Sequence, residues 1–225
     1  MEGEEEEEGP ETGVSIELDQ TRGDFNAGWD FNSGFLERIQ AFGGYADYQH
    51  AEIEDSGEVG TIFSNEGGEI RVEAIQRERD LSFGEWTAAH GVQYRERDFS
   101  AIGEEAFVPP TTTEQFGIYT FHALDIETIH LEAAGRYERT NQTNRTDDVD
   151  IDFDLFSVSG GGDIHIGDAI RVGGTLFRTE RAPASEELFS NGPHLATSQF
   201  EVGDVNLDKE VATGVEAAIR KKKNG

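Results

Sequence analysis

The stretch IETIHLEAAGRYER, residues 126–139, decides the fold class, because apolar and polar side chains alternate along most of it. One side of an extended chain would carry Ile129, Leu131, Ala133, Gly135 and Tyr137, and the other side would carry His130, Glu132, Arg136 and Glu138. Successive side chains of a β-strand point to opposite faces of a sheet, so this pattern predicts a strand with one apolar and one polar face. Helical spacing does not separate these residues in the same way.

The same alternation recurs along the chain, and it predicts nine strands with boundaries good to about two to four residues. The predicted strands are 14–29, 34–54, 66–78, 82–97, 113–124, 127–141, 149–165, 168–181 and 208–221. The last segment also contains good helix formers, but its β-branched residues Val211, Thr213 and Val215 favour a strand. No segment has a convincing amphipathic helical pattern.

Short and long connections alternate between these predicted strands. The short ones are 30–34, 79–82, 125–127 and 166–168, and the long ones are 55–66, 98–112, 141–148 and 182–207. An up-and-down meander therefore gathers the tight turns at one end and the long loops at the other, as outer-membrane barrels do. We predict an all-β protein, an antiparallel up-and-down meander of about nine or ten strands that forms a transmembrane-type β-barrel or partial barrel. The alternative is a soluble or engineered barrel or sandwich without transport activity, favoured by the weakly apolar outward positions Ala41, Gly43 and Thr120.

Charge and composition exclude several classes of function. The formal net charge of −29 argues against nucleic acid as a partner, because like charges repel. The chain has no cysteine, which excludes disulfides and thiolate metal sites. It has no apolar run of about 18 residues, and its first residues lack the basic and apolar regions of a secretory signal. We expect an acidic flexible segment at 1–12, a barrel at 13–221 and a basic tail at 222–225.

The long connection after the eighth predicted strand carries the most specific sequence signal. Residues 181–210 read RAPASEELFSNGPHLATSQFEVGDVNLDKE, which resembles a signature in the later part of TonB-dependent outer-membrane receptor barrels. The matching residues are Arg181, Ala182, Pro183, Glu187, Leu188, Gly192, His194, Ala196, Thr197, Glu201, Gly203, Asp204, Asn206, Leu207 and Glu210. The resemblance implies a receptor or transporter in the outer membrane, in contact with its lipid, that takes up a metal ion or metal complex. Residues 44–73 and 94–121 resemble the zinc-uptake branch of these receptors.

The chain also departs from the full receptor pattern. Full receptors carry an N-terminal plug domain, a motif for the energy-coupling protein, about 22 strands and an aromatic final residue. None of these is found in this sequence, and Val205 replaces the usual proline. We therefore expect a fragment or engineered excerpt, without the energy-coupling protein as a partner. The first and ninth predicted strands would also have to pair in parallel to close a barrel, which agrees with an excerpt.

A candidate metal site follows from alternation near one strand end. Tyr48, His50, Glu52 and Glu54 share one face of the strand predicted at 34–54, and imidazole with carboxylate suits Zn²⁺, the one ion the sequence suggests. His194 would complete the set, or Glu104 and Glu105 would. We predict His50, Glu52, Glu54 and His194 as metal ligands, against the plainer alternative of a polar strand face exposed to water.

A second acidic pattern predicts the orientation of one strand. Asp148, Asp150, Asp152 and Asp154 alternate with Val149, Ile151, Phe153 and Leu155. In a barrel, the apolar set would face lipid and the aspartates would face the lumen, with Arg136 as a compensating charge. The alternative is that these acids only hydrate the polar face. No nucleophile lies near a suitable base and no phosphate-binding loop is found, so we expect no enzyme.

Overall fold

The computed structural model describes residues 15–54, 56–103, 106–167, 169–194 and 199–221. The long strands are β1 (Ser15–Asp30), β2 (Leu36–Ile53), β3 (Val59–Gln76), β5 (Gly84–Gly103), β6 (Thr111–Ile126), β7 (Ile129–Asn144), β8 (Val149–Ile166), β9 (Ile170–Arg181) and β12 (Glu210–Lys221). The short elements are β4 (Arg79–Leu81), α1 (Ser185–Phe189), β10 (Asn191–His194) and β11 (Gln199–Val202). No helix in the described ranges has the length and apolar character needed to cross a membrane.

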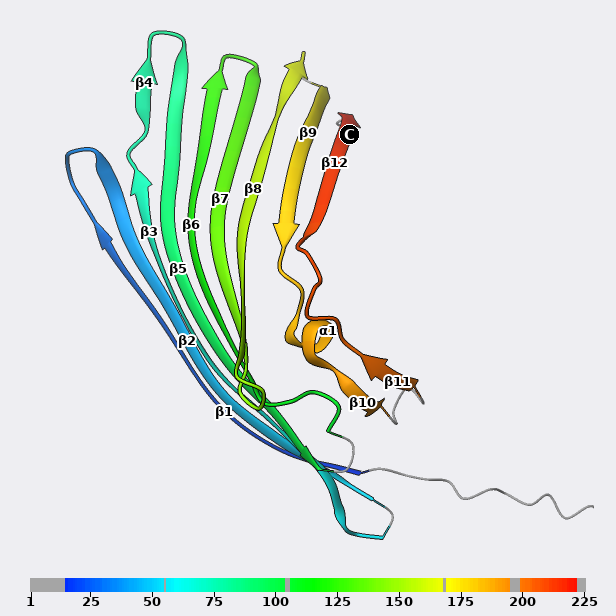
Figure 1. The fold of residues 1–225 in the computed structure, drawn as a ribbon. Coiled ribbons are helices and arrows are strands. Elements are labelled where there is room, and N and C mark those ends of the chain that lie inside the picture. The colour runs from blue at the N-terminus through cyan, green and yellow to red at the C-terminus, as the bar shows by residue number, and fades with distance from the viewer. Residues whose placement is uncertain (1–14, 55, 104–105, 168, 195–198, 222–225) are drawn as a thin grey trace, which may run out of the picture.

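The long strands form one antiparallel sheet of ten strands, which confirms the predicted all-β meander. Its order is β1-β2-β3-β5-β6-β7-β8-β9-β12, with β4 paired to β5, so every long strand lies beside its neighbour in sequence. The strand predicted at 208–221 is present as β12, paired with β9. The sheet is curved and open, with β1 and β12 at its two edges, as expected of a partial barrel (Figure 1).

The two ends of the sheet differ in the length of their connections, as the sequence analysis predicted. The turns β1–β2, β4–β5, β6–β7 and β8–β9 lie at one end, and the longer connections lie at the other (Figure 1). We call these the short-turn end and the long-loop end. Two predicted loops are shorter than expected, because the pairing of β3 with β5 continues to Thr61 and Gly103. Residues 79–82 were also predicted as a turn, but β4 pairs there with β5.

The sheet has two distinct faces. We call the face that carries α1 the inner face, because α1 lies inside the curve of the sheet, and the opposite one the outer face (Figure 1). Leu131, Val158 and Val215 lie on the outer face with 42%, 58% and 75% of their surface exposed. Arg97 lies on the inner face and reaches Glu186 of α1 at 3.5 Å. Around β7 the sequence interpretation is thus confirmed, with Leu131 and Tyr137 outward and Glu132 inward.

A tight contact explains one of the weakly apolar outward positions. The ring of Phe25 on β1 lies across Gly43 on β2, its partner in the register. A Cβ atom at Gly43 would come within 1.9 Å of that ring, so a larger residue would displace Phe25. The aromatic ring therefore supplies the apolar surface that the glycine lacks.

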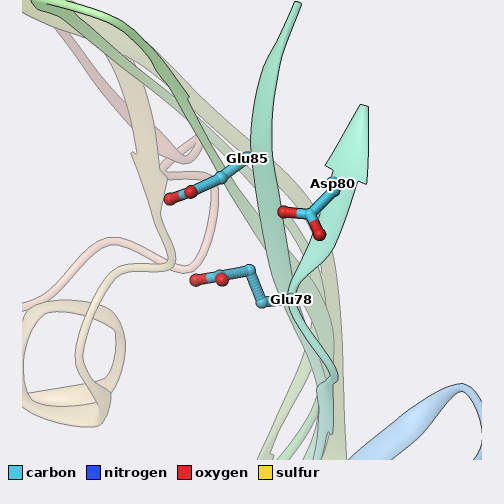
Figure 2. Close-up of side chains that lie close together, drawn as sticks. All are labelled: Glu78, Asp80 and Glu85. Atoms are coloured by element: carbon cyan, nitrogen blue, oxygen red, sulfur yellow. The ribbon is translucent and has the colours of Figure 1, made fainter. Parts of the chain in front are cut away.

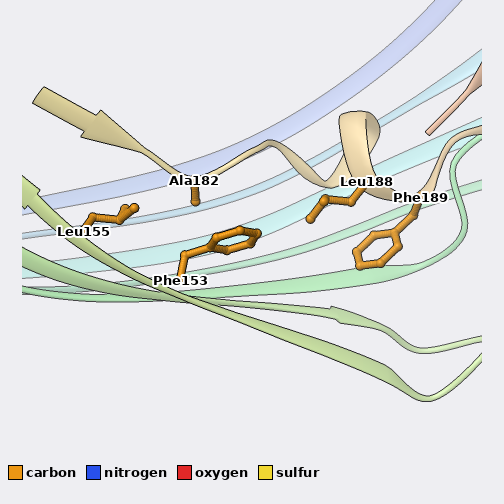
Figure 3. Close-up of a cluster of buried hydrophobic side chains, with 5 residues drawn as sticks. All are labelled: Phe153, Leu155, Ala182, Leu188 and Phe189. Atoms are coloured by element: carbon orange, nitrogen blue, oxygen red, sulfur yellow. The ribbon is translucent and has the colours of Figure 1, made fainter. Parts of the chain in front are cut away.

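The orientation predicted for the first half of β8 is wrong. Phe153 and Leu155 point to the inner face, where they are buried against Ala182, Leu188 and Phe189 (Figure 3). Val149 and Ile151 pack beside this cluster. The aspartates of the strand therefore point outward, not into the lumen, and Asp148 lies in the preceding turn with a φ of 55°.

The physical reason for the inversion is the segment that follows β9. Its helix α1 covers the inner face at the long-loop end, so inward side chains of β8 there meet Leu188 and Phe189 instead of water. The outward aspartates are compensated by β7, since Arg139 contacts Asp152 at 2.9 Å and Tyr137 donates to Asp154 at 2.6 Å. Arg136, the predicted partner, pairs with Glu138 on the inner face.

Within the segment predicted as the loop 182–207, the described residues 182–194 and 199–207 are folded and anchored. Arg181 donates two hydrogen bonds to Glu187, at 3.0 and 3.1 Å, and one to Glu210 at 2.9 Å. Gln142 donates to the Pro183 carbonyl at 2.9 Å. The strand β9 ends at Arg181, just before Pro183, as expected of a residue that cannot donate to a β-ladder. These contacts hold α1 and the β10–β11 hairpin at the long-loop end (Figure 1).

Candidate functional site

The inner face is hollowed on the side of β1, β2, β3 and β5. An open groove of about 720 Å³ lies there, and we call it the inner groove. Its polar lining includes Gln20, Arg22, Tyr48, Asn65, Glu69 and Arg97. These residues share one face because each lies at an alternate position on its strand, in register with the next strand.

Charges in the inner groove are held by paired side chains. Arg22 donates to both carboxylate oxygens of Asp24, at 2.8 and 2.9 Å. Arg97 donates to Asn65 at 2.9 Å. Its guanidinium also lies over the ring of Phe99, 5.0 Å from the ring centroid. Both guanidinium groups are thus already engaged within the chain, so an anionic or carbonyl-bearing ligand would compete with these contacts.

A second polar network continues the inner face toward the short-turn end. Glu73 accepts hydrogen bonds of 2.6 Å from Gln40 and of 2.6 Å from Tyr119, and it lies 3.5 Å from Arg71. These contacts join β2, β3 and β6 across the sheet. Polar groups of this kind suit an inner face in contact with water or a polar occupant, not a dry core.

Two of the four predicted metal ligands lie at the edge of this face. His50 and Glu52 share the inner face of β2 at the long-loop end, and Glu54 follows the strand and is exposed. The ring of His50 stacks on Phe63 with 4.6 Å between centroids, and its buried Nδ1 has no hydrogen-bond partner among the described residues. His194 lies in β10, but its side chain, like residues Glu104 and Glu105, is outside the described part. The four-ligand set therefore stays a prediction.

A different acidic group was not predicted from the sequence. Glu78, Asp80 and Glu85 place one carboxylate oxygen each within 4.8 Å of one another (Figure 2). They meet because β4 folds back on β5, which sets Asp80 opposite Glu85. All three are exposed and lie at the short-turn end, and no imidazole joins them. Alternation alone could not indicate this group, since the predicted turn at 79–82 concealed the pairing.

A comparison with protein families decides what kind of barrel this sheet represents. The family model described as "TonB dependent receptor-like, beta-barrel" matches residues 7–225. This chain belongs to the TonB-dependent receptor family. The resemblance of the 181–210 segment to these receptors is thereby confirmed, whereas the zinc-uptake branch stays a prediction.

Solved structures of this receptor family share the fold. The chain superimposes on the structure titled "Copper transporter OprC" with a TM-score of 0.76 at 15% sequence identity, over 92% of this chain and 36% of that one. The FrpB iron transporter from Neisseria meningitidis (F3-3 variant) gives a TM-score of 0.67 at 15% identity, over 92% and 35%. The receptor chain studied here thus spans about a third of the length of these structures. The family and both proteins are receptors or transporters, not enzymes, and they imply the outer membrane.

Proposed function

We propose that this chain is part of an outer-membrane receptor barrel that binds a metal ion or a metal complex for uptake. The observation that carries the proposal is the family match over residues 7–225, joined to two similar structures whose titles name copper and iron transport. The polar inner face supports it, because a transported solute needs a hydrated path. The soluble alternative would place its apolar face around a core, whereas here most of the exposed large apolar side chains lie on the outer face.

The outer face supports membrane insertion by its layered composition. On β5, Trp86 and Tyr94 bound a stretch of nine residues, close to the roughly 9–11 that a tilted strand needs to cross a bilayer. Tyr45, Tyr94 and Tyr137 mark the boundary nearer the long-loop end, and their hydroxyls donate to Glu66, to Glu96 and Glu114, and to Asp154 respectively. Aromatic girdles with charged residues beyond them are typical of transmembrane barrels.

Tryptophan quenching in lipid tests the membrane placement. Trp29 and Trp86 lie on the outer face near the short-turn end. In vesicles that contain lipids with brominated acyl chains, we expect both tryptophans to be quenched, measured in single-tryptophan variants that keep one and replace the other by Phe. Unquenched fluorescence of both tryptophans, together with a far-UV spectrum of a folded protein, would contradict the membrane placement.

The proposed metal site lies at the long-loop end and is formed by His50, Glu52, Glu54 and His194. Calorimetric titration of the purified receptor with Zn²⁺, Cu²⁺ and Fe²⁺ tests it, because imidazole and carboxylate ligands bind all three. We expect His50→Ala and His194→Ala each to weaken binding about tenfold or more.

His165→Ala serves as the matched control, since His165 lies on the same sheet at the opposite end. It should leave the affinity unchanged. Equal binding by the wild type and both His50 and His194 variants would remove these residues from the proposal. Uptake of a metal complex that does not contact His50 or His194 is measured separately, with the intact receptor in cells.

A further inference from the structure

A cluster of polar side chains lies on the outer face, between the level of Trp86 and the middle of the apolar band. It consists of Trp86 and His90 on β5 with Thr120 and His122 on β6, and we call it the histidine patch. The Nδ1 atom of His90 is 2.8 Å from Thr120 Oγ1, and Nε2 of His122 is 2.9 Å from the same oxygen. Trp86 donates from its indole nitrogen to Nδ1 of His122 at 3.3 Å. The proposed uptake function makes no use of these residues.

For neutral imidazole rings, the indole of Trp86 fixes the tautomer of His122. The indole N–H can only donate, so Nδ1 of His122 accepts and its proton is on Nε2. That N–H donates to Thr120 Oγ1, which then either donates its own hydrogen to Nδ1 of His90 or accepts a second hydrogen bond from it. The unused donor is Nε2–H of His90 in the first case and the Thr120 hydroxyl in the second. In both cases the patch keeps one unused donor and one unused acceptor, shared between His90 and Thr120.

Small residues make the surface around the patch shallow. In register with His90, Thr120 and His122 lie Ala74, Ala133 and Gly135, and Gly160 follows on β8. A Cβ atom added at Gly135 would meet nothing within 4 Å, and one at Gly160 would meet only a backbone oxygen at 3.9 Å. Larger side chains border this hollow, namely Val92 and Ile118 toward the long-loop end, Leu124 and Leu131 toward the short-turn end, and Val158 beside Gly135 on β8. The result is a hollow with apolar borders and a hydrogen-bonding floor.

We propose that this hollow is the contact surface between two copies of the receptor that lie side by side in the membrane. The inference rests on the membrane placement proposed above. Two copies inserted in the same direction carry the patch at the same depth, so a twofold axis along the membrane normal brings the patch against itself. It then supplies both halves of the contact, because His90 of each copy can form a hydrogen bond with Thr120 of the other.

The surroundings favour a second copy over lipid as the occupant. Acyl chains offer no acceptor at this depth, and an unsatisfied donor in hydrocarbon is unfavourable. Small residues such as Ala133 and Gly135 let two backbones approach closely, as they do at interfaces between membrane-spanning segments. The hollow therefore combines the two properties that a close, hydrogen-bonded contact inside a membrane requires.

Energy transfer between labelled copies of the intact receptor in lipid vesicles tests the proposal. The label is attached through Ser33→Cys in a turn, since this segment has no native cysteine. We expect transfer that depends on the ratio of protein to lipid. Thr120→Val removes the hydroxyl and should weaken association about tenfold, and Gly135→Leu fills the hollow and should weaken it further.

Two variants elsewhere on the outer face are matched controls. Thr213→Val removes a threonine hydroxyl on β12, and Gly23→Leu adds the same side chain to an unobstructed glycine on β1. Both should associate like the wild type. A receptor that stays monomeric at all protein-to-lipid ratios overturns the proposal, as does equal loss in test and control variants. Tryptophan quenching and metal titration on the same samples show separately whether membrane placement or metal binding has failed.

Discussion

At the scale of single residues, one carboxylate contributes to the anchoring of α1. The pKa of Glu187 lies below its ordinary value, because Arg181 donates two hydrogen bonds to the carboxylate and the Ala184 amide donates another, at 2.6 Å. Each of these bonds favours the charged form of the side chain. The ionised carboxylate thus joins the end of β9 to the first turn of α1.

This arrangement predicts a pH dependence of α1 docking. A lowered pKa means that the folded state binds the proton more weakly than the unfolded state, so the stabilisation is complete above about pH 5 and is lost as the pH falls below about 4. Arg181 and Glu187 are about half exposed, so solvent screening limits the effect to about 0.5 kcal/mol. An environment-sensitive dye on Asn191→Cys would report the loosening.

Glu187→Gln is the control for this prediction, because it keeps the size of the side chain and removes its titration. The dye signal of this variant should not change between pH 6 and pH 3.5. If the variant and the wild type respond alike to acid, a different group controls the docking of α1.

At the scale of a secondary-structure element, the outward-facing side chains of β8 change from acidic to apolar along the strand. Asp152 and Asp154 point outward near the long-loop end, whereas Phe156, Val158 and Ile164 point outward nearer the short turns. The change occurs beside Tyr137, whose ring lies 5.1 Å from that of Phe156 between centroids. We interpret this level as the place where the strand leaves the hydrocarbon layer.

The change of character predicts opposite responses at adjacent residues. Val158→Lys puts a charge on the lipid-facing side and should lower the free energy of unfolding in vesicles by about 2–4 kcal/mol. Ser159→Lys, one residue away on the inner face, should cost less than about 1 kcal/mol, because its ammonium reaches water. Urea unfolding in lipid measures both, and similar losses would contradict the assignment of the two faces.

The elements were predictable from the sequence to different degrees. The alternation in 126–139 is sufficient to predict this part of β7 and both of its faces, because no residue of β7 before Thr140 is buried. The same argument failed for Phe153 and Leu155, because their environment is set by Leu188 and Phe189 from a segment more than 30 residues later in the chain. Periodicity shows which side chains share a face, but it does not show what lies opposite.

The candidate site was less predictable than the fold. The sequence placed His50 and Glu52 on one face, and the strand pairing agrees. It could not indicate the hydrogen bonds that Glu73 accepts from Gln40 and Tyr119, because those residues belong to three different strands and meet only through the register. The acidic group around Asp80 depends in the same way on pairing between β4 and β5.

At the scale of the whole molecule, the open edges determine which amides are protected. Every residue of β1 is exposed, and only one side of that strand is paired. Amides of β1 that point away from β2 should exchange with solvent at least about a hundredfold faster than amides of β6, which is paired on both sides. Hydrogen exchange of this chain in detergent, read by NMR, tests this. Equally slow exchange throughout β1 would show that another strand covers this edge.

The directions of the two edge strands determine whether a closed antiparallel barrel needs an odd or an even number of further strands. Nine long strands alternate in direction, so β1 and β12 point the same way. A seam between them can be antiparallel throughout only if an odd number of further strands is inserted. The total number of strands is then even, as in bacterial single-chain barrels. Inserting an even number of strands would leave one parallel pair, so it is incompatible with a fully antiparallel closed barrel.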